Sequence, residues 1–112
     1  MAGQVGCDAE VVVSRTADEW LHLLGAEQFA LAELVARERG EDLAVSATRA
    51  WGAIECLRKV GRALPGPVTL GESPPGGWVL LKAGTASIAT FATHVRHEAA
   101  PVVFTFLTEA ES

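Results

Sequence analysis

The chain has 112 residues, of which 49% are hydrophobic and 21% are charged, a balance that excludes a disordered or fibrous protein. Its length predicts a single domain over residues 1–112, with one small core. Nine Lys and Arg against fourteen Asp and Glu give a net charge of −5 without any basic run, which argues against nucleic-acid binding. No apolar run reaches the roughly 20 residues of a membrane span and no secretory signal is evident, so we expect a cytoplasmic protein. Cys7 and Cys56 are then expected to be free thiols.

The first part of the chain predicts a strand followed by a helix. Residues 5–13 are rich in valine and favour a strand, and Thr16 with Glu19 forms a capping box that begins a helix. Gly25 predicts a kink or a break in this helix, and Gly40 predicts its end. The apolar residues that give the segment its helical spacing are Trp20, Leu21, Leu24, Leu31, Leu34 and Val35.

A second helix is expected to begin near Asp42 or Ser46 and to end before Pro65. Steps of three and four residues between apolar positions predict one buried face. That face consists of Leu43, Ala47, Ala50, Ile54, Leu57, Gly61 and Leu64. A separate stripe beside it consists of Trp51, Glu55 and Lys59. The helix therefore has one side to bury and another to present.

The rest of the chain favours strands. Residues 67–72, 78–83 and 101–108 are rich in Val, Leu, Phe and Thr. Residues 86–95 fit either a helix or a strand, and their threonine content with the preceding Gly84-Thr85 turn favours the strand of a hairpin. The predicted fold class is α+β, with an N-terminal strand, two helical segments and a mostly antiparallel sheet.

The expected hairpin would have apolar side chains on both faces. It pairs Leu81 with Ile88 on one face and Trp78 with Phe91 on the other. Such a sheet needs a helix over one face and a partner chain or a second subdomain over the other.

Two groups of charged residues carry the chemistry. Asp8 and Glu10 lie two positions apart on the first strand, so their carboxylates share a face and repel each other unless a cation lies between them. Oxygen ligands of this type suit Mg²⁺, although a solvated strand end would look the same. Glu55 with Lys59 one turn later is, taken alone, an ordinary surface pair worth about 0.2–0.5 kcal/mol.

Together these motifs resemble the 4′-phosphopantetheinyl transferases. Residues 5–10, VGCDAE, are similar to the V-G-x-D-x-E strand of that family, and residues 51–59, WGAIECLRK, are similar to its W-x-x-K-E-x-x-x-K helix. The resemblance covers the whole chain, because a strand-rich tail follows that helix in the family. It is closest to the second half of the two-lobed class and, more narrowly, to the transferase-like domain at the C-terminus of enediyne-type iterative polyketide synthases.

The resemblance implies Mg²⁺-dependent transfer of 4′-phosphopantetheine from coenzyme A to a serine of an acyl carrier protein, in polyketide biosynthesis. By the same resemblance, Asp8, Glu10 and Glu55 would hold a Mg²⁺ that bridges the coenzyme A pyrophosphate. Glu55 would also be the base for the carrier serine. Lys59 would lie near the pyrophosphate or the departing oxygen and so bind coenzyme A.

The sequence departs from the family in two respects. Ile54 stands where the helix motif has a lysine, so one phosphate-binding cation is missing. The chain also has the length of a single lobe, so we expect either a homo-oligomer or a complementary N-terminal lobe as a partner. These departures support an alternative, a catalytically degenerate docking or structural module of a polyketide synthase that binds carrier proteins or assembles subunits.

Overall fold

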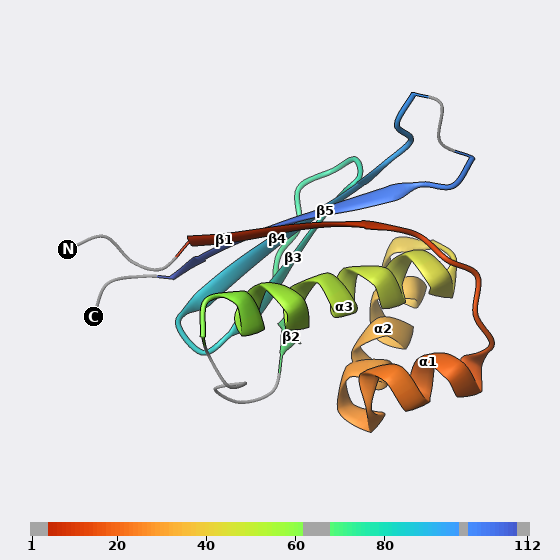
Figure 1. Cartoon of the computed structure of the whole chain (residues 1–112), viewed down its shortest axis with the longest axis horizontal. Coiled ribbons are helices and arrows are strands. Elements are labelled where there is room, and N and C mark those ends of the chain that lie inside the picture. The colour runs from red at the N-terminus through yellow and green to blue at the C-terminus, as the bar shows by residue number, and fades with distance from the viewer. Residues whose placement is uncertain (1–4, 62–67, 97–98, 110–112) are drawn as a thin grey trace.

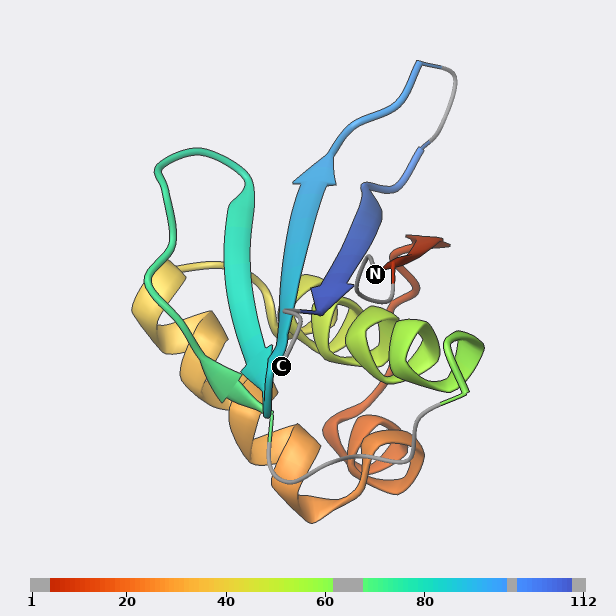
Figure 2. The same cartoon turned by 90° about the vertical axis from the view of Figure 1, so that its left-hand side faces the viewer.

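The computed structural model describes residues 5–61, 68–96 and 99–109 (Figure 1). Five strands form one antiparallel sheet in the order β1-β5-β4-β3-β2, and the three helices lie on the same side of it. Figure 2 shows β2 to β5 side by side. The elements are β1 (Val5–Val11), α1 (Ala17–Leu24), α2 (Ala26–Arg39), α3 (Leu43–Lys59), β2 (Thr69–Leu70), β3 (Trp78–Ala83), β4 (Ala86–Thr93) and β5 (Val102–Glu109). The predicted α+β class with an antiparallel sheet is therefore confirmed.

The first helical segment is divided as its glycine suggested. Thr16 Oγ1 accepts a hydrogen bond from the Glu19 amide at 3.1 Å, and Glu19 Oε1 accepts one from the Thr16 amide at 2.8 Å. This capping box begins α1. Gly25, with φ of 84°, separates α1 from α2, so the helix is broken and the described part of the chain contains three helices. Within the described residues, no helix has the length and apolar character needed to cross a bilayer.

The helix α3 begins after Asp42 rather than at Ser46. It ends at Lys59, so Gly61 lies beyond it, while Leu64 and Pro65 lie outside the described residues. The prediction for Leu21 was wrong, because this side chain is 41% exposed on the outer side of α1. An eight-residue helix at the edge of the fold has only a narrow buried stripe, here Trp20 and Leu24.

The ambiguous segment 86–95 forms strand β4, and the hairpin has the expected register. Trp78 pairs with Phe91 and Leu81 pairs with Ile88. The first strand ends at Val11 rather than at residue 13. β2 is much shorter than the predicted segment 67–72, whose first residue, Pro67, lies outside the described residues.

The two faces of the sheet differ in what covers them. The inner face packs against α2 and α3 in a core that includes Leu31, Val35, Ala53, Leu57, Val79, Leu81, Ile88 and Leu107. A second cluster lies among the helices, around Trp20, Leu24, Ala32, Ala47 and Ala50. On the outer face, Trp78 contacts Phe91 at 4.8 Å and Phe106 at 6.3 Å between ring centroids, and Phe106 is 46% exposed. Among the described elements, no helix covers this outer face (Figure 1).

Candidate functional site

Two glycines allow helix α3 to lie very close to the sheet at the level of Asp8. Asp8 pairs with Thr105 in the register of β1 and β5, and Gly52 of α3 faces that threonine. A β-carbon at position 52 would overlap Thr105 Oγ1, and one at Gly6 would lie 3.0 Å from Val60 Cγ1. Side chains at these positions would push the helix away from the strands. The glycines therefore position α3 close to β1. The stripe of Trp51, Glu55 and Lys59 on α3 then lies beside Asp8 and Glu10 of β1.

Asp8 and Lys59 form the closest contact in this region. Lys59 Nζ lies 2.7 Å from Asp8 Oδ1 and 3.4 Å from the carbonyl oxygen of Cys7. The Asp8 side chain is 8% exposed, whereas that of Lys59 is 56% exposed. The hydrogen bond to Asp8 raises the pKa of Lys59. Lys59 thus acts as the internal counterion of a nearly buried carboxylate.

The second Asp8 oxygen and the Glu10 carboxyl are less well stabilised. Asp8 Oδ2 is buried and has no hydrogen-bond partner among the described residues. Burial raises the pKa of Glu10, and the neighbouring Asp8 carboxylate and the charge of Glu55 raise it further. Lys59 lowers it only in part. Glu10 is therefore near enough to both Asp8 and Glu55 for their negative charges to act on it.

Glu55 lies at the same end of α3 and has its own cationic neighbour. Its Oε2 atom is 3.2 Å from Arg58 Nη1, with Glu55 22% exposed and Arg58 66% exposed. The Arg58 guanidinium carbon also lies 5.8 Å from the centroid of the Trp51 ring. A pair this exposed contributes little to stability and leaves Glu55 accessible.

The donor types at this site fit Mg²⁺, although the present arrangement is not a ready coordination sphere. In the described part of the chain, no group of three or more His, Cys, Asp or Glu side chains is arranged to hold a metal ion. Lys59 and Arg58 contact two of the three acids instead. The buried, unpartnered Asp8 oxygen and the repulsion felt by Glu10 are both features that a cation would relieve.

The raised pKa of Glu10 predicts how this site affects stability. A carboxyl that binds its proton more tightly in the folded state stabilises the fold at pH below its ordinary value of 4.5. That contribution is lost as the pH rises through the folded pKa. Glu10→Gln should therefore raise the melting temperature at pH 7 in the absence of metal and flatten its decline above pH 4.5.

Thermal unfolding followed by circular dichroism from pH 4 to 8 measures this effect. Glu33→Gln, an exposed change on α2, is the matched control and should have little influence. A melting temperature at pH 7 that falls in Glu10→Gln but not in the control would contradict this account of the acidic cluster, which consists of Asp8, Glu10 and Glu55.

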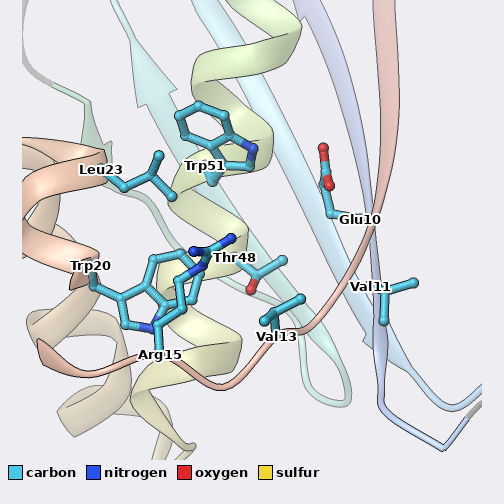
Figure 3. Close-up of a pocket in the computed structure, with 8 residues that line it drawn as sticks. All are labelled: Glu10, Val11, Val13, Arg15, Trp20, Leu23, Thr48 and Trp51. Carbon is cyan, nitrogen blue, oxygen red and sulfur yellow. The ribbon is translucent and has the colours of Figure 1, made fainter.

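A pocket of about 130 Å³ begins beside Glu10 (Figure 3). It is lined by Glu10, Val11, Val13, Arg15, Trp20, Leu23, Thr48 and Trp51. Figure 3 shows the Arg15 side chain beside Trp20, and its guanidinium carbon is 5.4 Å from the Trp20 ring centroid. Arg15 and the lining role of Trp20 were not predicted from the sequence, because only the fold brings the loop after β1 against α1 and α3. Gly52 was also missed, although a glycine inside a helix is a recognisable signal of close packing.

The remaining predicted residues lie away from the acidic cluster or are inert. Ile54 packs against the apolar cluster that lies among the three described helices, so its apolar character has a structural reason. Both cysteines are free thiols, as predicted. Burial raises the pKa of Cys56 to about 11, so this thiol stays protonated at neutral pH and is a poor nucleophile.

No protein-family model, curated protein sequence or solved structure matches the chain.

Proposed function

We propose that the chain is a Mg²⁺-dependent 4′-phosphopantetheinyl transferase domain, or one lobe of such an enzyme, which acts on an acyl carrier protein. The observation that carries the proposal is the placement of Asp8, with one unpartnered buried oxygen, beside Glu10 and next to the Glu55 and Lys59 stripe of α3. The family motifs of strand and helix also lie far apart in sequence and adjacent in space. Helix α3 packs against β1 and so brings the two motifs together.

In this proposal Asp8, Glu10 and Glu55 would hold the Mg²⁺, which would neutralise charge on the pyrophosphate of coenzyme A. Glu55 would accept the proton of the carrier serine. The serine oxygen would bond to the phosphorus that carries pantetheine, and the bridging oxygen would leave with the nucleotide. Lys59 would stabilise the negative charge of the phosphates. Positioning and charge neutralisation suffice for this chemistry, so the protein needs no covalent intermediate.

A second candidate function rests on the outer face of the sheet. The aromatic surface formed by Trp78, Phe91 and Phe106 is apolar, partly exposed and separate from the acidic cluster. A surface of this kind favours contact with another protein. The alternative is a docking or structural module of a polyketide synthase, and the same surface would serve a homo-oligomer or a complementary lobe in the first proposal.

The two functions are separated by incubating the chain with coenzyme A, Mg²⁺ and an apo acyl carrier protein, followed by mass spectrometry of the carrier. The transferase is supported by a carrier mass increased by one phosphopantetheine group, absent when Mg²⁺ is replaced by EDTA or when the carrier serine is alanine. An unmodified carrier that nevertheless binds the chain supports the docking module. An unmodified carrier that does not bind contradicts both.

A further inference from the structure

The pair formed by Asp8 and Lys59 places a surface cation on a carboxylate that the proposed function assigns to a metal. The Asp8 side chain is almost completely buried, so it needs a positive partner in the absence of metal. Lys59 provides it at 2.7 Å, from the last turn of α3 and with more than half of its own side chain exposed. The carboxylate is held within the fold, whereas its counterion reaches it from the surface.

We propose that Lys59 is an exchangeable counterion, which neutralises Asp8 in the metal-free chain and is displaced when a divalent cation binds. This inference rests on the proposed function only for the assignment of Asp8 as a ligand. An ammonium group bound to one oxygen of Asp8 and a divalent cation at the same carboxylate would repel each other, because their charges would lie only a few ångströms apart. Lys59 can leave at little cost, because its flexible stem lies at the surface and its charge returns to water.

The exchange also gives the released ammonium a role. Lys59 stays on the stripe of α3 that carries Glu55, one turn away, so it becomes available to an anionic group of a substrate when the metal is in place. Metal binding would thereby prepare the cation that the phosphates need. In the metal-free state the same ammonium is held at Asp8 and is not available.

Metal affinity provides the first test, with Mn²⁺ alone as the probe and isothermal titration calorimetry as the measurement. Lys59→Met retains the apolar stem and removes the competing charge, so Mn²⁺ should bind about fivefold more tightly or better. Lys82→Met is the matched control, because it makes the same charge change on an exposed residue of β3 that contacts Ser87. Its affinity for Mn²⁺ should remain near that of the unmodified chain.

The second test needs no substitution. Lys59 and Lys82 are the two lysines of the chain, so reductive methylation with ¹³C labels only these side chains and the N-terminal amine. Titration with Mg²⁺ should move the Lys59 methyl resonance towards that of the exposed Lys82, which should itself stay in place.

The outcomes separate this inference from the proposed function. Mn²⁺ affinity that is unchanged or weaker in Lys59→Met, or a Lys59 resonance that does not move at saturating Mg²⁺, overturns the exchange and leaves the transferase assay unaffected. Tighter binding together with a negative transferase assay supports the exchange and contradicts the proposed function. If neither the unmodified chain nor Lys59→Met binds Mn²⁺, both the exchange and the metal site are overturned.

Discussion

Glu55→Gln should lower the rate of phosphopantetheine transfer by a factor of about 10²–10⁴, the usual contribution of a general base. Glutamine has the shape of glutamate, so the packing of α3 is retained. It removes the negative charge that would contact the metal and the atom that would accept the serine proton. The measurement is the initial rate of carrier modification at saturating coenzyme A and Mg²⁺, with kcat and KM determined separately.

A fall in kcat distinguishes this role from a merely structural one. Glu27→Gln, an exposed substitution on α2, provides a control with the same change of charge and should retain the full rate. The circular dichroism spectrum and melting temperature of Glu55→Gln should stay close to those of the parent chain, because its pair with Arg58 is exposed. A Glu55→Gln protein that transfers at the parental rate would remove Glu55 from the mechanism.

Arg49→Met should lower the free energy of unfolding by about 3–5 kcal/mol, the range for breaking a buried ion pair. Arg49 is 2% exposed. Its Nε and Nη2 atoms each lie 2.9 Å from an oxygen of Glu41, and its Nη1 donates to the carbonyl oxygens of Gly77 and Thr90 at 2.9 and 3.0 Å. Methionine fills much of the volume but leaves the Glu41 carboxylate with only the Ser46 hydroxyl as a side-chain partner among the described residues, and two carbonyl groups without this donor.

Urea unfolding monitored by tryptophan fluorescence measures this loss. Arg39→Met is an informative control, because Arg39 also donates to a carbonyl of the loop before β3, that of Gly76 at 2.9 Å, but does so at the surface. Its effect should be below about 1 kcal/mol. Arg49→Lys should rescue little, since one ammonium cannot reproduce the planar arrangement of donors. Equal losses for Arg39→Met and Arg49→Met would show that burial of the Arg49 pair adds nothing.

Local signals predicted most of the fold. The capping box at Thr16, the break at Gly25 and the hairpin turn at Gly84 each depend on neighbours within a few residues, and all three are present in the structure. The prediction failed where burial depends on a distant element. Leu21 has the right spacing for a buried helical face, but α1 lies at the edge of the fold and its outer side meets no other described element.

The residues of the candidate site could be predicted from the sequence, but the contacts between them could not. Periodicity places Asp8 with Glu10 and Glu55 with Lys59, and the structure brings these two pairs together across β1 and α3. Periodicity alone could not indicate which acid Lys59 contacts, because a long side chain can reach several partners. Arg49 was also missed, since a charged residue within a helix is normally exposed and its partners Glu41 and Thr90 are set by tertiary packing.

The contact between Gly52 and Thr105 has a consequence for attempts to make this protein more robust. A glycine inside a helix costs about 1 kcal/mol relative to alanine, and the buried hydroxyl of Thr105 has no partner among the described residues. Engineers seeking a higher melting temperature would naturally choose alanine at the first position and an apolar residue at the second. Such a pair of changes would widen the spacing between α3 and the strands and carry Glu55 away from Asp8. The gain in helix propensity would therefore be lost to the poorer packing of α3 on the sheet, and the two halves of the acidic cluster would no longer meet.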